Sequence, residues 1–277
     1  MDIVLWHKIL NPYAMAVDEL LLKLRNTKRS YQKRGEYCPI EHVTGRVKSI
    51  TSILDKMQKK GIPFDKMEEE VEDIAGIRII CQFVEDIEKI SEMLMRRNDL
   101  EIVQVKDYIR NHKESGYRSY HLVANYTVNT LDGPKQIYVE IQIRTMAMDF
   151  WATTEHSMQY KYKGRIPQKV ANRLQTTAEA ITVMDKEMSA VREEIMDAQM
   201  SSQLRYNLVE DIVTTIENLY QVTSRRQIEK IQEEFYRIYS EGDMDELIHY
   251  HDQLDLIAQS YKAQSFNGAG GMHTDED

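Results

Sequence analysis

The first sixty residues place apolar side chains at the spacing of amphipathic helices. One stripe predicts a helix over residues 1–30 and consists of Tyr13, Val17, Leu20, Leu21 and Leu24. A second stripe predicts a helix from about Ile40 to Lys60 and consists of Val43, Val47, Ile50, Leu54 and Met57. Gly61 and Pro63 end that helix, because neither residue favours its continuation. A short acidic helix that ends near Asp73 follows.

In the middle of the chain, apolar and polar residues alternate, a pattern that is typical of β-strands. Four strands are predicted: Gly76–Phe83, Glu101–Ile109, Arg118–Val128 and Lys135–Thr145. Residues Ile87–Arg97 have helical spacing, and residues 131–134 form a hairpin-type turn. The predicted fold class is therefore α+β, with a mixed β-sheet and helices packed on it.

Helical spacing returns after the last strand. It runs from Met146 to about Ala198, and three further helical stretches follow within residues 201–264. Residues 265–277 lack apolar content, so a disordered tail is predicted there. The predicted organisation is a core domain over residues 1–165, trailing helices over 166–200, a helical extension over 201–264 and the tail.

The last predicted strand separates apolar from polar side chains most clearly. Successive side chains alternate between faces, so one face holds Ile137, Val139, Ile141 and Ile143, and the other holds Tyr138, Glu140, Gln142 and Arg144. A slip of one residue would bury Glu140 and Arg144, which fixes the apolar face inward. The polar row on a rigid element suits a positioned site. A half-solvated surface strand would show the same pattern.

Length, charge and cysteine content narrow the class of protein. The 277 residues, 42% apolar and 29% charged, suffice for one large or two ordinary globular domains. A net charge of −9 disfavours bulk affinity for nucleic acid or anionic lipid. No apolar run approaches the roughly 18 residues that span a bilayer, and the N-terminus does not resemble a signal peptide. Cys38 and Cys81 lack metal-ligand spacing and suit a reducing compartment, so a cytoplasmic location is predicted.

Basic residues are concentrated between Thr44 and Lys60, although the chain as a whole is acidic. Five lysines and arginines stand there against Asp55 alone. Helical spacing would put four polar residues along one side of the predicted helix: Lys48, Ser52, Lys56 and Lys59. Such a stripe suits a polyphosphate, and a solvated charged face is the alternative.

A second polar group lies between Lys106 and His121, just ahead of a predicted strand. It combines tyrosines, which can stack on bases by roughly 1–3 kcal/mol per base, with lysines that can contact phosphates. A structural tyrosine cluster is the alternative. Asp73 stands at a helix-to-strand junction, where it can join Glu140 in holding a hard cation or serve as a turn former.

Five strings follow one another along the chain: Val43–Lys48, Asp73–Arg78, Lys113–His121, Val139–Thr145, and Phe150–Ala152 with Glu155-His156. Taken together and in this order, they resemble the synthetase domain of the RelA/SpoT family. Each string is weak alone, but five in register are highly specific. The chain is most similar to the single-domain small alarmone synthetases, over roughly residues 1–200.

The resemblance implies a nucleotidyltransferase-like core and a definite reaction. The family moves the β,γ-pyrophosphate of ATP to the ribose 3′-hydroxyl of GDP or GTP, which releases AMP and gives (p)ppGpp. Asp73 and Glu140 would hold Mg²⁺, the implied cofactor, and Glu140 would also accept the proton of the attacking hydroxyl. ATP would be bound by Arg46 and Arg78 around the adenine and by Lys48, Ser52, Lys56 and Lys59 at the phosphates. The guanine nucleotide would be bound by Tyr117, stacked on the base, and by Lys106, Lys113 and His121 at its phosphates. Gln142 and Arg144 would complete this guanine-nucleotide site, either by supporting those residues or at the phosphate side.

The resemblance also implies partners and regulation. Tetrameric members assemble through their trailing helices, so a homotetramer that acts in the stringent response is expected. ATP and GDP or GTP are the expected ligands, without a membrane partner and without nucleic acid as a main partner. Members that bind the alarmone in a central cleft would have Phe and Asn where this chain has His42 and Asp149. A carboxylate repels a polyphosphate, which speaks against product activation.

The matching strings begin near residue 43 and leave no room for the hydrolase domain of long members. The His251-Asp252 pair lies in the C-terminal helices and is expected to be structural. Synthesis without hydrolysis is therefore predicted. Three alternatives remain: a toxin-like enzyme that transfers pyrophosphate to the 3′ end of tRNA, a non-catalytic guanine-nucleotide sensor, and a helical scaffold.

Overall fold

A computed structural model describes residues 3–161 and 167–268 of the chain. The chain divides into two compact units, Met1–Val191 and Arg192–Asp277. The boundary falls within the segment 166–200 that the sequence separates as trailing helices. Of the predicted tail, residues 265–268 belong to the last helix and residues 269–277 lie outside the described part of the chain.

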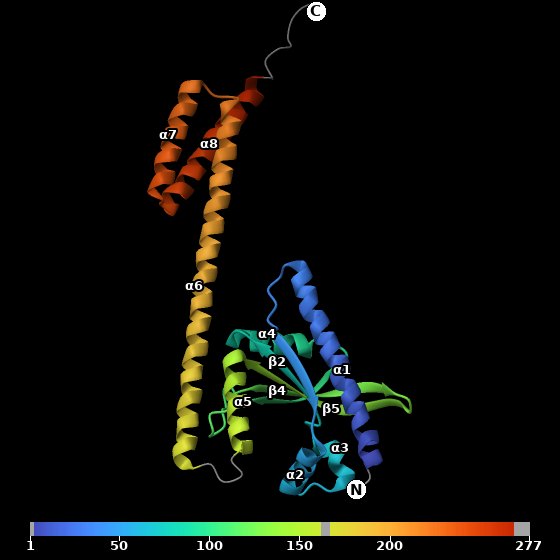
Figure 1. The fold of residues 1–277 in the computed structure, drawn as a ribbon. Coiled ribbons are helices and arrows are strands. Elements are labelled where there is room, and N and C mark those ends of the chain that lie inside the picture. The colour runs from blue at the N-terminus through green and yellow to red at the C-terminus, as the bar shows by residue number, and fades with distance from the viewer. Residues whose placement is uncertain (1–2, 162–166, 269–277) are drawn as a thin grey trace, which may run out of the picture. The chain divides into compact units, whose positions relative to one another are not determined.

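The first unit is built on a five-stranded mixed sheet (Figure 1). Its strands are β1 (His42–Val47), β2 (Ala75–Cys81), β3 (Glu101–Asp107), β4 (Tyr120–Thr130) and β5 (Gly133–Thr145). They lie in the order β1-β2-β5-β4-β3, in which only β2 and β5 are parallel. The four predicted strands correspond to β2 through β5, which confirms the α+β class and the mixed sheet.

Strand β1 corrects the prediction of a helix from Ile40 to Lys60. Only its second part is helical, as α2 (Ile50–Lys60), which Ser49 caps through a side-chain oxygen that accepts a hydrogen bond from the Ser52 amide. Val43 and Val47 fit a helical stripe by spacing, but they also share one face of a strand. Gly45 stands between them without a side chain, so the two-residue period was not visible in the sequence.

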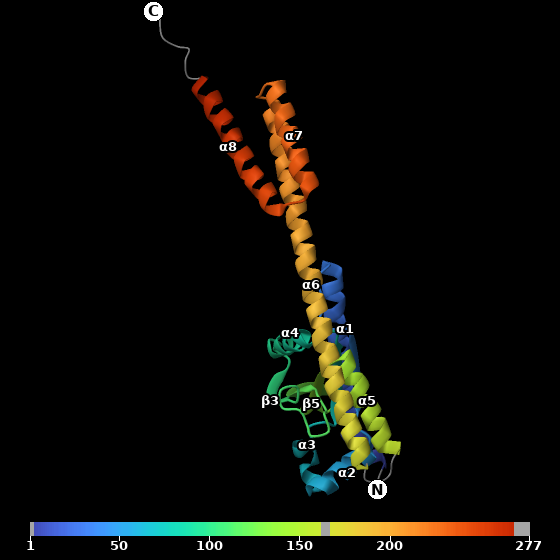
Figure 2. The same ribbon diagram turned by 90° about the vertical axis from the view of Figure 1, so that its left-hand side faces the viewer.

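The apolar face of the sheet is covered by α1 (Ile3–Arg34) and α4 (Val84–Met95) (Figures 1 and 2). The predicted stripe of α1 is buried at Tyr13, Val17, Leu20 and Leu24. These side chains join one core with the inward face of β5, where Ile137, Val139, Ile141 and Ile143 are at most 3% exposed. Burial of this face fixes which side chains of β5 point to the opposite side.

The opposite face of the sheet carries a row of polar residues that crosses all five strands. Register pairs Thr44 with Arg78, Arg78 with Gln142, Gln142 with His121, and His121 with Lys106. Directly paired residues on neighbouring strands lie on the same face, so five distant parts of the sequence meet in one line. Glu140 lies two residues from Gln142 on β5 and therefore belongs to the same face.

Short elements and two further helices complete the first unit around this polar face. A 3₁₀ turn (Phe64–Lys66) and α3 (Met67–Glu70) lead to Asp73 just ahead of β2. On the other side lie α5 (Met146–Lys161) and the first part of α6 (Gln168–Tyr220), which enclose a small core of Trp151, Ala152 and Ala178. The Trp151 indole donates to the Leu174 carbonyl at 3.0 Å, which ties α5 to α6.

The second unit contains the C-terminal part of α6 with α7 (Arg225–Glu241) and α8 (Met244–Gly268) (Figure 2). The first of the three predicted helical stretches is therefore the continuation of α6 rather than a separate helix. The unit has its own apolar core, formed by Ile212, Ile216, Leu219, Ile228, Phe235, Ile238, Leu247, Tyr250 and Leu254. Among the described residues, no helix is long and apolar enough to cross a membrane.

Gly45 sets how closely β1 approaches α1. A Cβ atom on Gly45 would lie 2.7 Å from Val17 Cγ1 and 3.0 Å from Ile77 Cδ1, inside contact distance. Gly45→Ala is expected to lower the free energy of unfolding of the first unit by about 1–3 kcal/mol, as overpacking does. Both tryptophans of the chain, Trp6 and Trp151, lie in this unit. Their fluorescence during urea denaturation therefore measures its stability.

The control is Gly76→Ala on the neighbouring strand. A Cβ atom there would meet the Arg46 carbonyl at 3.7 Å, an ordinary contact. Equal stability of the two variants would contradict the assignment of Gly45 as the point of closest approach.

Candidate active site

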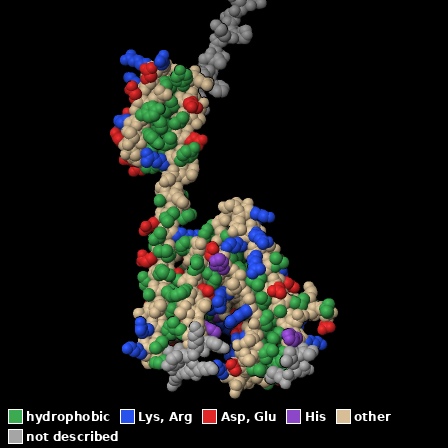
Figure 3. All heavy atoms as spheres, in the orientation of Figure 1, with side chains coloured by type: hydrophobic (Ala, Val, Ile, Leu, Met, Phe, Trp, Pro, Cys, Tyr) green, Lys and Arg blue, Asp and Glu red, His purple; other side chains and the backbone are tan. Residues whose placement is uncertain are grey.

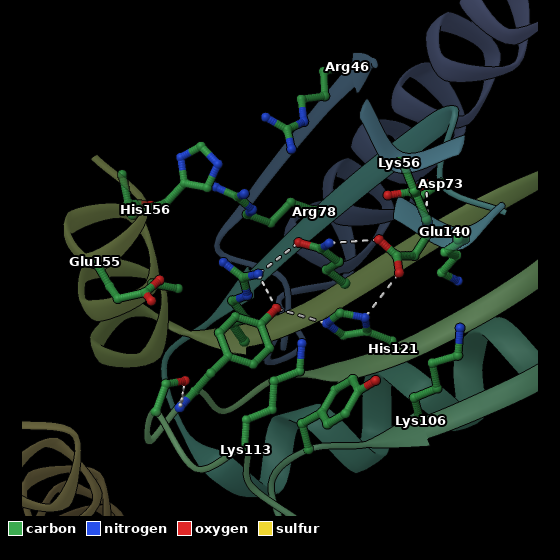
Figure 4. A pocket seen from close by; sticks show the side chains of 18 residues that line it. Arg46, Lys56, Asp73, Arg78, Lys106, Lys113, His121, Glu140, Glu155 and His156 are labelled. Atoms are coloured by element: carbon green, nitrogen blue, oxygen red, sulfur yellow. Dashed lines mark hydrogen bonds and ion pairs between the residues drawn. The ribbon is translucent and has the colours of Figure 1, made fainter. Parts of the chain in front are cut away.

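The polar face of the sheet forms the floor of a cleft of about 690 Å³ in the first unit (Figure 4). Figure 3 shows Lys and Arg side chains gathered along a hollow of this unit. The walls come from α2, α5 and the loop ahead of β4. The lining residues are Arg46, Lys56, Lys60, Asp73, Arg78, Lys106, Tyr108, Lys113, Ser115, Tyr117, His121, Glu140, Gln142, Arg144, Ala152, Thr153, Glu155 and His156.

Glu140 is held by a closed ring of hydrogen bonds that begins and ends at its carboxylate. On one side, the Arg144 guanidinium donates to Gln142 Oε1 at 2.8 Å, and Gln142 Nε2 donates to Glu140 Oε2 at 2.8 Å. On the other, Arg144 donates to the Tyr117 hydroxyl at 2.5 Å, Tyr117 bonds His121 Nε2 at 3.0 Å, and His121 Nδ1 bonds Glu140 Oε1 at 3.1 Å. Both carboxylate oxygens are therefore fixed.

Arg144 and Glu140, on opposite sides of the ring, determine which group donates each hydrogen bond. Arginine can only donate and an ionised carboxylate can only accept. The ring is satisfied when the Tyr117 hydroxyl donates to His121 Nε2 and His121 Nδ1–H donates to Glu140. Burial raises the pKa of Glu140, but the hydrogen bonds from His121 and Gln142 outweigh it and leave the pKa below its ordinary value. Glu140 is thus a buried, ionised and oriented carboxylate.

Arg144 is the anchor of the ring and is only 4% exposed. Besides Gln142 and Tyr117 it donates to Ser119 Oγ at 3.1 Å and to Asp149 Oδ1 at 3.2 Å. All three guanidinium nitrogens therefore have acceptors, as a buried arginine requires. Arg144 faces the cleft as a support for its neighbours rather than as a free cation.

Asp73 is held by two lysines that come from different parts of the chain. Lys48 Nζ lies 2.6 Å from Asp73 Oδ2, and Lys56 Nζ lies 2.7 Å from Oδ1. Lys48 precedes α2 and Lys56 lies on it, so the predicted helical stripe is wrong for Lys48, yet both side chains reach the same carboxylate. Burial raises the pKa of Asp73, and the two lysines lower it by more, so the net pKa is below its ordinary value.

The loop ahead of β4 presents aromatic and basic groups to the cleft. The Lys113 ammonium lies 4.9 Å from the centroid of the Tyr108 ring and 5.0 Å from that of Tyr117. Gly116 has a φ of 89°, and a Cβ there would meet the Ala178 Cβ at 2.6 Å, so the loop seats closely on α6. Lys106 on β3 pairs with Glu72 at 2.6 Å at the far side of the cleft.

The cleft brings together most of the residues that the sequence singles out. Arg46, Lys56, Asp73, Arg78, Lys106, Lys113, Tyr117, His121, Glu140, Gln142 and Arg144 all line it. Lys48, Ser52 and Lys59 do not line it. They border an adjoining depression of about 380 Å³, which shares Lys56 and Lys60 with the cleft.

Several residues that line the cleft had no role predicted from the sequence. Lys60 and Tyr108 belong to segments already noted as basic or rich in tyrosine, so a signal for them was present. Glu155 belongs to a string that matches the family, whereas Thr153 lies outside those strings and reaches the cleft only because α5 packs on the sheet. Asp149 was noted as a departure from the family, and its carboxylate is paired with Arg78 and Arg144. Its charge is thus compensated within the protein.

Asp73 and Glu140 are the carboxylates that fit a hard cation. Both line the cleft, and both also line the smaller depression beside β1 and β2. Within the described residues, no group of three or more His, Cys, Asp or Glu side chains is arranged to hold a metal. Two carboxylates suit Mg²⁺, which is commonly bound by one or two carboxylates together with substrate phosphates.

Residues 45–165 match the family model described as a region found in RelA / SpoT proteins. The chain is 52% identical over 199 residues to the GTP pyrophosphokinase YjbM of Bacillus subtilis, covering 72% of this chain and 94% of that protein. It resembles the crystal structure of small alarmone synthetase 1 from Bacillus subtilis bound to its product pppGpp (TM-score 0.67, 53% identity, 69% of this chain and 97% of that one). It also resembles the crystal structure of the same synthetase bound to AMPCPP, with a TM-score of 0.61 and 47% identity. That match covers 69% of this chain and 98% of the other.

Removal of Arg144, the anchor of the hydrogen-bond ring around Glu140, is expected to destabilise the first unit. Arg144→Met leaves the acceptors on Ser119 and Gln142 without this donor and leaves Asp149 paired with Arg78 alone. Breaking a buried pair in this way costs about 3 kcal/mol or more. The control is Arg96→Met, because Arg96 forms an exposed pair with Glu92, which contributes about 0–1 kcal/mol. Urea denaturation followed by tryptophan fluorescence measures both. A loss no larger for Arg144→Met than for Arg96→Met would refute the anchoring role.

The lysine pair on Asp73 predicts a pH dependence. Because the native pKa lies below the unfolded value of about 3.9, the stabilisation is present above that value and is lost as pH falls through the lower native pKa. Lys56→Ala is expected to raise the pKa of Asp73, as followed by ¹³C NMR of its carboxyl group. Lys59→Ala is the control, since Lys59 makes no ion pair within the described residues. An unchanged Asp73 pKa in Lys56→Ala would contradict this account.

Proposed function

The chain belongs to the RelA/SpoT family, and from this membership we propose that it is a small alarmone synthetase. It transfers the β,γ-pyrophosphate of ATP to the ribose 3′-hydroxyl of GDP or GTP, forms (p)ppGpp and releases AMP. The similarity to a GTP pyrophosphokinase at 52% identity supports this activity, as does the likeness to synthetase structures with pppGpp and AMPCPP. The observation that carries the proposal is one cleft with basic groups on both sides of an oriented carboxylate, Glu140.

ATP occupies the side of the cleft formed by β1, β2 and α2. Arg46 and Arg78 lie on neighbouring strands and line this side, and planar guanidinium groups stack well on an adenine ring. Lys56, Lys48 and Lys59, together with Ser52, border the adjoining depression and bind the phosphates. A polyphosphate that draws Lys48 and Lys56 away from Asp73 frees the Asp73 carboxylate for a cation.

The guanine nucleotide occupies the side formed by β3, β4 and the loop ahead of β4. Tyr117 stacks on the base, while the exposed Lys113 moves from the Tyr117 ring to a phosphate. Lys106 approaches a phosphate from β3. Gln142 and Arg144 keep their expected supporting role, and we extend it to His121, because the polar atoms of all three take part in the ring around Glu140. These three residues contribute to binding of the guanine nucleotide chiefly by holding Tyr117 and Glu140 in place.

Glu140 accepts the proton of the ribose 3′-hydroxyl. The deprotonated oxygen attacks the β-phosphorus of ATP, the bond from that phosphorus to the oxygen bridging it to the α-phosphorus breaks, and AMP leaves with that oxygen. Mg²⁺ held by Asp73 and Glu140 supplies positive charge for the phosphate oxygens when bound. Holding two nucleotides in line contributes roughly 7–11 kcal/mol toward the barrier, so positioning is the main task of this cleft.

We further propose a homotetramer that works in the cytoplasm during the stringent response, without hydrolysis of its product. A tRNA acceptor is disfavoured because the residues proposed for a free guanine nucleotide are all present, with Tyr117 and Lys113 in the same cleft. A non-catalytic sensor is disfavoured because it would need neither Glu140 nor Asp73. The ring that orients Glu140 would then have no task.

The proposal is tested with purified protein, labelled ATP, Mg²⁺ and GDP, GTP or tRNA in separate reactions. AMP and a guanosine 3′-pyrophosphate are the expected products with GDP or GTP. Glu140→Gln is expected to lower kcat by about 10²–10⁴-fold, the usual contribution of a general base, with AMPCPP affinity within threefold of the wild type. Glu155→Gln, which removes a charge from the same cleft, is expected to lose less than tenfold.

Each contrary result has a distinct meaning. AMP formation only with tRNA would replace the guanine nucleotide as acceptor, and no AMP formation with any acceptor would leave a binding protein. Near-normal turnover by Glu140→Gln would remove Glu140 from the chemistry.

A further inference from the structure

Asp149 lies in the first turn of α5, directly after β5, and does not itself line the cleft. Thr145 caps this turn, because its side-chain oxygen accepts from the Met148 amide at 3.1 Å. The turn places the Asp149 carboxylate beside two arginines from the sheet. One oxygen, Oδ1, lies 3.1 Å from Arg78 Nη1 and 3.2 Å from Arg144 Nη1.

The two arginines would repel each other without this carboxylate. Burial lowers the pKa of Arg78, the charge of Arg144 lowers it further, and Asp149 acts in the opposite direction. In the part of the chain that the structure describes, Asp149 is the carboxylate paired with Arg78, and Arg78 Nε has no hydrogen-bond partner. The position of the Arg78 guanidinium therefore depends on Asp149.

Arg144, the other partner, anchors the ring that holds Tyr117 and Glu140. Asp149 thus joins Arg78, which is assigned to the ATP side of the cleft, to Arg144, which supports the guanine-nucleotide side. The connection is short, since a single oxygen atom contacts both guanidinium groups. A shift of Arg78 changes the bond that holds Arg144, and through Arg144 it changes Tyr117.

We propose that Asp149 is a positioning residue that couples the two nucleotide subsites, so that each nucleotide strengthens the binding of the other. The inference rests on the proposed function for the identity of the two ligands. Adenine stacked on Arg78 restrains that side chain, and the shared oxygen transmits the restraint to Arg144 and Tyr117. Coupling between two sites is reciprocal, so GDP must raise the affinity for an ATP analogue by the same factor as the analogue raises the affinity for GDP.

The test measures binding rather than turnover. Isothermal titration of the wild-type protein with AMPCPP, with and without saturating GDP, is expected to show an affinity increase of at least about fivefold, and the reverse titration the same factor. In Asp149→Ala the factor is expected to fall to about one. In Asp149→Asn, which keeps an oxygen acceptor without the charge, it is expected to be intermediate. In turnover, Asp149→Ala should raise KM for both substrates and leave kcat within tenfold.

Asp99 provides a matched control outside the cleft. Its carboxylate also bridges two cations, with Oδ2 at 2.8 Å from both Lys23 Nζ and Arg97 Nη2. Asp99→Ala therefore removes a comparable bridge and is expected to keep the full coupling factor, whatever stability it loses. Thermal unfolding of all variants shows which are folded at the titration temperature. If Asp149→Ala is unfolded there, Asp149→Asn decides.

Three results would overturn the proposal: no coupling in the wild type, wild-type coupling in the Asp149 variants, or equal loss of coupling in Asp99→Ala. None of these would affect the proposed function, which depends on product formation by the wild-type protein. Absence of product with intact, coupled binding of both nucleotides would instead refute the proposed function and leave the coupling in place.

Discussion

The buried apolar face of β5 is the constraint on which the site depends. Four β-branched side chains on that face pack against α1 and α4, and they leave β5 only one register in which charged groups stay out of the core. Glu140, Gln142 and Arg144 must then share the other face. At two-residue spacing along a strand, they are close enough for Arg144 to support Gln142 and for Gln142 to support Glu140.

Charge in the cleft is compensated by ion pairs between its own residues. Asp73 is neutralised by lysines, and Arg78 and Arg144 share the Asp149 carboxylate. Leaving a buried charge without a partner would be costly, and the charged residues of the cleft accordingly have counter-charges within the protein. In the proposed reaction, a polyphosphate would bring negative charge to the lysines and so release Asp73. The same pairs therefore hold the charged groups of the cleft in place and are the contacts that a bound polyphosphate would change.

The second unit differs from the first in charge. The segment after Val191 contains 18 acidic and 7 basic residues, whereas residues 1–191 contain 27 acidic and 29 basic residues. The acidity of the whole chain therefore belongs to the C-terminal segment, and whole-chain charge says little about the ligands of the cleft. The synthetase relative matches only 72% of this chain. The second unit has a separate core, and the lining residues given for the cleft all belong to the first unit.

The sequence by itself determined the strands β2 to β5, the buried stripe of α1, and the polar face of β5, because these follow from local periodicity and from the cost of burying charge. It also identified most residues of the cleft, chiefly through the family resemblance. It could not reveal β1, because Gly45 has no side chain to mark the alternation. Only the tertiary structure decided that Lys48 and Lys56 meet on Asp73, that His121 orients Glu140, and that Asp149 joins Arg78 to Arg144. Those contacts connect residues on separate elements, and their distances depend on how helices pack against the sheet rather than on spacing along the chain.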